Sequence, residues 1–295
     1  MTLGQLGEER LLQKLLPNLP LNSAVIAGAG DDCAVVRLEG GKDLLLKTDC
    51  IVEGMHFTQE ARASAVGWKA MARPLSDFAA MAGVPQFALV TLIAPAETKV
   101  AWATGLYRGL AKAAREFEVA IVGGETSGTR GPIAVSVSMT GVVERNRWVS
   151  RSGGKVGDEL FVTGRLGGSG RGRHLRFMPR IEEARWLRGN FAVHAMMDLS
   201  DGLGADLPRL ARASGLGFKV NEGDIPRSRG CSVKEAISDG EDFELLFAIS
   251  PNDCAKLEKS WRRRFPKLPL TRIGRLIPKS AIRDPHFPSG YVHFQ

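Results

Sequence analysis

The sequence predicts an α/β (α+β) protein built from two domains, residues 1–146 and 147–295. The chain of 295 residues is long enough for two ordinary domains, and its 44% apolar residues are enough for two cores. Short apolar runs rich in β-branched residues alternate with segments of helical periodicity along its whole length. A charged, glycine-rich stretch at residues 144–159 interrupts this alternation and predicts the connection between the domains.

In the first domain, short β-branched runs predict strands and longer periodic segments predict helices. Within the second helical segment, Trp102, Leu106, Leu110 and Ala113 recur at helical spacing. The predicted strands are 33–38, 43–49, 86–94, 119–125 and 133–143, and the helices are 63–83 and 97–116. In the second domain the strands are 160–164, 193–198, 218–220, 243–250 and 270–277, with helices near 181–187, from 203, and near 252–265.

Composition favours a cytoplasmic protein without membrane association. No run of about 18 apolar residues is present, so no membrane span is expected. The N-terminal segment carries charges where a signal peptide needs an apolar centre. The four cysteines are scattered without metal-type spacing, which fits free thiols in a reducing compartment.

The chain is basic, with a formal charge of +8 and a pI near 9.5. The densest basic runs, 169–180 and 259–267, lack the interleaved aromatic side chains of a stacking platform for nucleic acid. We therefore expect a small polyanion such as a nucleotide, and no nucleic acid, to be the partner. Nucleic-acid binding stays as an alternative that a steep dependence on salt would reveal.

Acidic residues recur beside the predicted strands. Asp31 and Asp32 lie in a glycine turn before one strand, and further acids end other strands or lie near the buried stripe of the first helix: Asp49, Asp77, Glu125, Asp198 and Asp201. Strand ends face the crevice in which open α/β layers bind ligands. Acids gathered there would repel one another without a cation, and oxygen ligands favour Mg²⁺. The pattern therefore predicts a magnesium–nucleotide site.

Seven motifs occur in order: GAGDDCAVV, KTDCIVEGMHF, LSDFAAMAG, VGGETS, SRSGGKVGD, MMDLSDGL and DGEDFEL. With these motifs the chain resembles the thiamine-monophosphate kinases of the aminoimidazole-ribonucleotide-synthetase-like superfamily. The resemblance implies two α/β domains, a homodimer formed through the N-terminal domains, and ATP held by several Mg²⁺ ions. It also implies transfer of the γ-phosphoryl group of ATP to thiamine monophosphate, which gives thiamine diphosphate.

The resemblance assigns roles position by position. The implied metal ligands are Asp31, Thr48, Asp49, Asp77, Glu125, Asp198 and Asp201. The implied nucleotide contacts are Tyr107, Gly124, Glu125, Arg151 and Ser200, and the implied contacts to thiamine monophosphate are His56, Glu241 and Tyr291. Asp198, Asp201 and Arg151 are the implied catalytic residues.

The expected chemistry suits a site rich in carboxylates and poor in histidine. The acceptor is already an anionic phosphate, so no general base is needed, and metal ions with Arg151 would screen the repulsion between two polyanions. Lys47, Glu125 and Asp239 depart from the residues usual in the family. They leave open a different acceptor within the superfamily, or a nucleotide-binding module without turnover.

Overall fold

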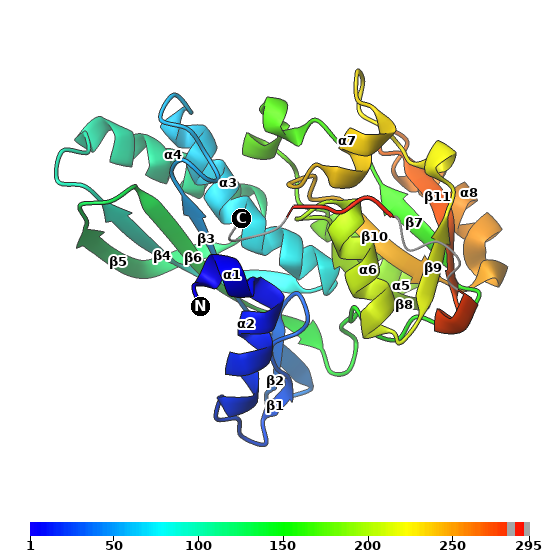
Figure 1. Cartoon of the computed structure of the whole chain (residues 1–295). Coiled ribbons are helices and arrows are strands. Elements are labelled where there is room, and N and C mark those ends of the chain that lie inside the picture. The colour runs from blue at the N-terminus through cyan, green and yellow to red at the C-terminus, as the bar shows by residue number, and fades with distance from the viewer. Residues whose placement is uncertain (282–286, 292–295) are drawn as a thin grey trace.

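A computed structural model describes residues 1–281 and 287–291. Its first sheet has six strands in the order β1-β2-β3-β6-β4-β5, and only the β4–β5 pair is parallel. The strands are β1 (Val25–Ala27), β2 (Ala34–Arg37), β3 (Lys42–Val52), β4 (Val84–Ala94), β5 (Ala120–Gly128) and β6 (Ala134–Glu144). In Figure 1, β3, β4, β5 and β6 of this sheet lie on the left of the molecule, and β1 and β2 lie at the bottom.

Two helices, α3 (Ala63–Ala80) and α4 (Val100–Glu116), pack against this sheet and against each other. Their backbones lie in close contact, because a Cβ at Gly67 would lie 2.0 Å from the carbonyl oxygen of Leu106 and one at Gly109 equally close to that of Ser64. Two short N-terminal helices, α1 (Leu3–Leu6) and α2 (Glu8–Leu15), precede β1.

The second sheet has five antiparallel strands in the order β8-β10-β7-β11-β9. These are β7 (Glu159–Thr163), β8 (Val193–Asp198), β9 (Gly217–Val220), β10 (Leu245–Ile249) and β11 (Leu270–Ile277). The helices of this half are α5 (Ile181–Asn190), α6 (Leu203–Ala213), α7 (Val233–Ser238) and α8 (Cys254–Arg264).

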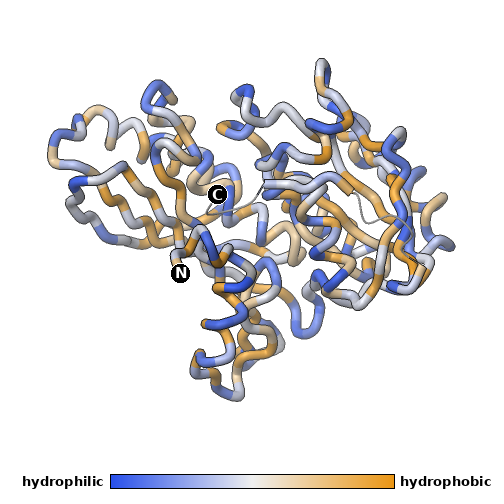
Figure 2. Tube along the Cα trace, viewed as in Figure 1, coloured by the Kyte–Doolittle hydropathy of each residue, from blue (hydrophilic) through white to orange (hydrophobic). Residues whose placement is uncertain are grey.

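Both faces of the second sheet are buried. One face, with Phe161, Met196 and Phe247, belongs to a hydrophobic core that continues into α3 and the first sheet. The other face, with Val162 and Met197, packs against α6 and α7. In Figure 2 these central strands are coloured as apolar, and α3 runs between the two sheets in Figure 1. The helix also contacts α5 and β8, so one helix belongs to the packing of both halves.

The structure confirms two α/β units. It contradicts the expectation that the acidic residues meet because they stand at strand ends on one edge of a sheet. Most neighbouring strands are antiparallel, so consecutive strands end at opposite edges of a sheet. Asp49 and Glu125 lie within β3 and β5 rather than at their ends. Acids from different strands are brought together by the packing of one half on the other.

Among the described residues, every helix is too short or too polar to cross a membrane.

Candidate active site

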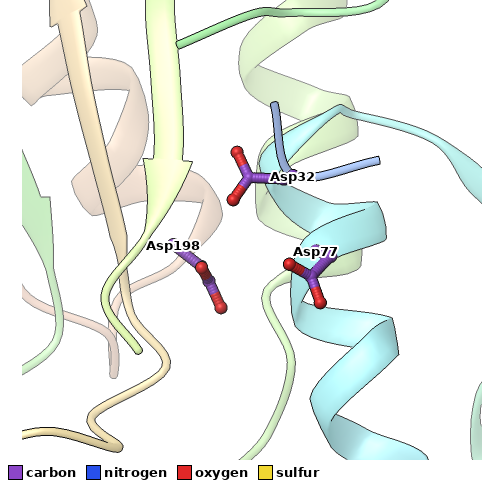
Figure 3. Close-up of side chains that lie close together, drawn as sticks. All are labelled: Asp32, Asp77 and Asp198. Atoms are coloured by element: carbon purple, nitrogen blue, oxygen red, sulfur yellow. The ribbon is translucent and has the colours of Figure 1, made fainter. Parts of the chain in front are cut away.

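Three buried carboxylates from distant parts of the chain meet between the two halves. Asp32 precedes β2, Asp77 lies on α3, and Asp198 ends β8. One oxygen of each lies within 4.8 Å of the others, and Figure 3 shows the three side chains converging from these separate segments. Their exposed fractions are 1%, 7% and 2%. Such burial of three like charges is costly unless cations or hydrogen bonds compensate it.

Part of this compensation comes from the protein. The Ser76 hydroxyl donates to Oδ2 of Asp198 at 2.6 Å. The Arg151 guanidinium donates to both oxygens of Asp32, at 3.1 Å from Nε and 2.6 Å from Nη2. Asp31 turns away to accept hydrogen bonds from Ser150 Oγ at 2.6 Å and from the backbone N–H of Arg151 at 3.1 Å. Asp31 and Asp32 therefore fasten the first domain to the segment that enters the second.

Lys47 supplies a further positive charge, with Nζ 2.8 Å from Oδ1 of Asp77. Although burial lowers the pKa of Lys47, the charges of Asp77 and Asp49 raise it above its ordinary value. Burial raises the pKa of Asp77 well above that of an exposed aspartate, against the lowering effect of Lys47. Burial and the charge of Asp32 raise the pKa of Asp198 to about 7. The pKa of both carboxyl groups is thus raised mainly by burial, although the charge of Lys47 acts in the opposite direction.

The donor set fits a divalent cation. Asp32, Asp77 and Asp198 form one cluster, and Asp49 lines the hollow beside Asp77 and Asp198, so the available donor atoms are carboxylate oxygens. Among the described residues, Oδ2 of Asp49 is buried without a hydrogen-bond partner. Oxygen-only sites suit Mg²⁺. A hollow of about 340 Å³ opens onto them and is lined by Asp49, Asp77, Asp198, Arg151, Ser200 and Asp201 among others. Asp201 is held there by Arg209, with Nη1 2.5 Å from Oδ2.

A second hollow of about 360 Å³ adjoins the first and contains all three expected contacts to the acceptor: His56, Glu241 and Tyr291. The two hollows share Arg73, Ser200, Asp201 and Phe243 in their walls, so they are adjacent. Nδ1 of His56 accepts the backbone N–H of Val52 at 3.1 Å. Burial and the charge of Arg73 lower the pKa of His56 to about 4, so the ring is neutral at pH 7.

Glu241 is held by a lysine that the sequence analysis did not single out. The Lys69 ammonium is completely buried and bonds to Oε2 of Glu241 at 2.8 Å, the carbonyl oxygen of His56 at 2.5 Å and Nδ1 of His174 at 2.8 Å. Although burial raises the pKa of Glu241, the His174 hydrogen bond and the charge of Lys69 lower it to about 2. The glutamate is thus ionised at the wall of the second hollow.

Lys69, Arg73 and Asp77 form a polar ridge on α3, one residue on each successive turn. Residues four apart lie on the same face of a helix, so this spacing in the sequence was the signal that could have identified the first two. Lys69 reaches Glu241, Arg73 lines both hollows, and Asp77 reaches the carboxylates. The ridge connects the two hollows.

Asp239, one of the departures noted in the sequence, also lines the second hollow. Its Oδ2 accepts the backbone N–H of Gly168 at 2.7 Å, and Asp242 accepts that of Gly167 at 3.0 Å. The loop that follows β7 is therefore fastened beside the hollow, where Ser169 and Gly170 form part of the wall.

Four residues that were expected to bind metal ions or the nucleotide lie apart from the carboxylate cluster within one chain. Side chains alternate along β3, so Thr48 points to the opposite face of the sheet from Lys47 and Asp49, and its Oγ1 lies 3.1 Å from Oγ of Ser138. Glu125 pairs with Thr91, and β6 and β4 lie between β5 and β3. At about 4.8 Å between strands, Glu125 is about 14 Å from β3.

Gly124 and Tyr107 also lie apart from the carboxylates, within β5 and on α4 respectively. A Cβ at Gly124 would lie 1.8 Å from the carbonyl oxygen of Val90, so strand packing requires glycine there. Tyr107 lies on α4 and lines a hollow with Thr126 and Gly128 of β5. In the described part of the chain, neither residue lines the hollow that contains the carboxylates.

Comparisons with known proteins agree over nearly the whole chain. Residues 30–143 match the protein family described as AIR synthase related protein, N-terminal domain. Residues 150–280 match the family described as AIR synthase related protein, C-terminal domain. The thiamine-monophosphate kinase of Rhodopirellula baltica is 38% identical, over 91% of this chain and 92% of the relative. That of Aquifex aeolicus is 34% identical over 100% of both.

Solved structures show the same similarity. AaThiL complexed with AMPPCP and TMP matches with a TM-score of 0.81 and 31% identity, over 100% of this chain and 96% of that one. The hydrogenase maturation protein HypE of Escherichia coli matches with a TM-score of 0.69 over 92% of both chains. At 19% identity, HypE shares the fold only.

Proposed function

Because this chain belongs to the thiamine-monophosphate kinase family and phosphorylates thiamine monophosphate with ATP, we propose which of its residues carry out the transfer. Asp32, Asp49, Asp77 and Asp198 hold Mg²⁺ ions, with Asp31, Asp201 and Ser200 beside them. The acceptor lies in the adjoining hollow against His56, Glu241 and Tyr291. The observation that carries this proposal is that the carboxylate hollow and the acceptor hollow are adjacent and share four lining residues.

Bound Mg²⁺ would neutralise the β- and γ-phosphates of ATP and stabilise the charge on the transferring group. The residues of the chain supply the rest. Arg151, held against Asp32, points its charge toward Asp198 and offers it to the nucleotide phosphates. Glu241 presents an ionised carboxylate and Tyr291 a ring face to the cationic thiamine. No side chain has to remove a proton, because the phosphate of the acceptor is already ionised.

We also propose that two copies of the chain associate through the outer face of the first sheet. Leu46, Phe87, Leu89 and Val122 are 36%, 49%, 49% and 59% exposed on this sheet, and they line one hollow. A contiguous apolar surface of this kind is typical of a protein interface. A second copy would cover it and would carry Tyr107, Gly124, Glu125 and Thr48 toward a shared nucleotide site.

The four cysteines of the described chain are free thiols, which fits a reducing compartment. We therefore place the enzyme in the cytoplasm. Its proposed partners are ATP, thiamine monophosphate and a second copy of itself.

The direct test incubates the purified protein with ATP, Mg²⁺ and thiamine monophosphate and measures thiamine diphosphate by mass spectrometry. We expect stoichiometric thiamine diphosphate and ADP, and no product when Mg²⁺ is removed with a chelator. Folded protein that binds ATP without forming thiamine diphosphate would overturn the assignment. Formation of ADP with a different acceptor would then identify another member of the superfamily, and ATP binding alone would identify a module without turnover.

A further inference from the structure

We propose that Arg73 is a catalytic residue that binds the phosphate of the acceptor and stabilises the phosphoryl group during transfer. This inference rests on the proposed function and assigns a residue to it that neither the motifs nor the acid pattern indicated. Arg73 is the member of the α3 ridge that lines both hollows. It therefore stands where the acceptor phosphate and the γ-phosphate of ATP have to meet.

The guanidinium of Arg73 lies between one carboxylate of each hollow. Its Nη2 is 3.6 Å from Oδ1 of Asp49, and its Nη1 is 3.7 Å from Oε1 of Glu241. Both distances exceed those of a hydrogen bond, so each carboxylate attracts the group without fixing it. The ring of Phe243 lies beside it, 6.0 Å from the guanidinium carbon. The arginine is thus held in place by charge and packing while its donors remain available.

The Nε–H of Arg73 is buried and has no hydrogen-bond partner among residues 1–281 and 287–291. A buried donor left unpaired costs about 1–3 kcal/mol, and more when it is charged. The side chain is only 15% exposed, so bulk water offers limited compensation. An arginine presents five donors in a planar fork that matches a phosphate. A phosphate at the junction of the hollows would accept hydrogen bonds from the Nη groups, whose contacts with Asp49 and Glu241 are longer than hydrogen bonds.

Other arginines of the molecule differ from Arg73 because their guanidinium groups donate hydrogen bonds to carboxylates. Arg151 donates two hydrogen bonds to Asp32, and Arg180 donates two to Glu244, at 2.7 Å and 2.6 Å. Arg209 donates to Asp201 and Asp206. Each of these groups is fixed by the protein, whereas Arg73 is placed at the junction and left without such bonds.

The reaction at this position balances without a proton. A phosphate oxygen of the acceptor forms a bond to the γ-phosphorus of ATP, and the bond from that phosphorus to the bridging oxygen breaks. The electron pair leaves with ADP. During this exchange three phosphate groups with their negative charges lie close together. Arg73 would donate to an oxygen of the acceptor and to one of the transferring group, which lowers the repulsion between them.

The test measures binding and turnover separately. Titration calorimetry compares Arg73→Met with the unmodified enzyme for two ligands, thiamine monophosphate and thiamine, which differ only by the phosphate. We expect the affinity for thiamine monophosphate to fall at least tenfold, and the affinity for thiamine to change less than twofold. Turnover with ATP should fall by about 10²–10³, the usual loss on removing a group that stabilises transferring charge. Arg73→Lys keeps the positive charge but lacks the planar guanidinium. Its affinity for thiamine monophosphate and its turnover should therefore lie between those of Arg73→Met and those of the unmodified enzyme.

Arg62→Met, an exposed arginine that precedes the same helix, is the matched control and should leave both affinities unchanged. Equal losses of affinity for the two ligands, or no loss for thiamine monophosphate, in variants that unfold at the normal temperature would overturn the inference. Should Arg73→Met fail to fold, the same comparison with Arg73→Lys decides it. Failure of the unmodified enzyme to form thiamine diphosphate would instead contradict the proposed function.

Discussion

At the scale of single residues, the site combines carboxylates that the protein neutralises with carboxylates that it leaves incompletely neutralised. Asp32 is matched by Arg151, and Asp201 by Arg209. The Asp198 carboxylate accepts a hydrogen bond from the Ser76 hydroxyl, and one buried oxygen of Asp49 has no hydrogen-bond partner in the part of the chain that the structure describes. Unpaired buried charge reduces stability, so its presence at one place in the molecule indicates a site that a cation completes.

Asp198→Asn separates this functional role from a structural one. Asparagine has nearly the same shape and can still accept the hydrogen bond of Ser76, but it lacks the charge that a metal ion requires. We expect turnover to fall by at least about 10³, while the temperature of unfolding stays equal or rises because a buried charge is removed. Asp224→Asn, on an exposed turn, should leave turnover unchanged. Full activity of Asp198→Asn would show that the metal ions lie elsewhere.

The raised pKa of Asp198 predicts that metal affinity depends on pH. Burial raises this pKa to about 7, so below pH 7 the carboxyl of the metal-free protein is mostly protonated. A metal ligand has to be deprotonated, so binding releases the proton. Affinity for Mn²⁺, followed by its paramagnetic signal, should therefore increase between pH 6 and pH 8, by up to about tenfold per unit below the pKa. The increase should be smaller in Asp198→Asn, and an unchanged affinity in the unmodified enzyme would contradict the assignment.

At the scale of elements, the sequence predicted α3 and α4 because helical periodicity reports burial on one face of a helix, and it predicted the long strands from their apolar, β-branched runs. It did not predict β1 or α7, which have three and six residues and too few positions to show a period. It also placed Asp49 and Glu125 at strand ends that meet, which the antiparallel order of the sheet contradicts. Asp32 was noted among the acids but was not assigned as a metal ligand, and Lys69 and Arg73 were not selected although they share a helix face with Asp77. The contacts of Asp32 with Arg151 and of Lys69 with Glu241 join the two halves of the chain, which the sequence does not show.

Asp239, which differs from the residue usual in the family, affects the position of the loop that follows β7. Asp239 accepts the N–H of Gly168, and this bond holds the loop beside the acceptor hollow. We expect Asp239→Gly to free the loop and to raise the KM for thiamine monophosphate several-fold with a smaller change in kcat. Limited proteolysis should cut the loop faster in this variant. Asp239→Asn keeps an acceptor oxygen and should behave nearly normally; equal effects of both variants would mean that the charge, rather than the bond, is important.

At the scale of the whole molecule, the two halves share one hydrophobic core, and their carboxylates meet where they pack. The division into domains at residue 146 remains a prediction, since the packing joins the halves. The placement of Thr48, Tyr107, Gly124 and Glu125 away from the carboxylates gives the proposed association of two copies a function: each copy would complete the site of the other.

Leu89→Glu tests that association. The side chain is 49% exposed in one copy and would be buried between two, where a charge opposes association. We expect sedimentation velocity to show a dimer for the unmodified chain and a monomer for the variant, with a loss of ATP affinity. Leu21→Glu, equally apolar but away from this face, should stay dimeric. A monomeric unmodified chain with full activity would contradict the proposal.

The polar ridge of α3 also sets a length. A helix rises about 1.5 Å per residue, so Lys69 and Asp77 lie about 12 Å apart along its axis, and Arg73 lies midway. Because one helix positions both ends of the proposed site, the ring of the acceptor and the metal-bound donor would be kept at a set separation. Thiamine diphosphate is longer than the acceptor by one phosphate, and in the proposed site its terminal group would occupy the space of the γ-phosphate of ATP. A second addition would then be excluded, because ATP and the product could not bind together.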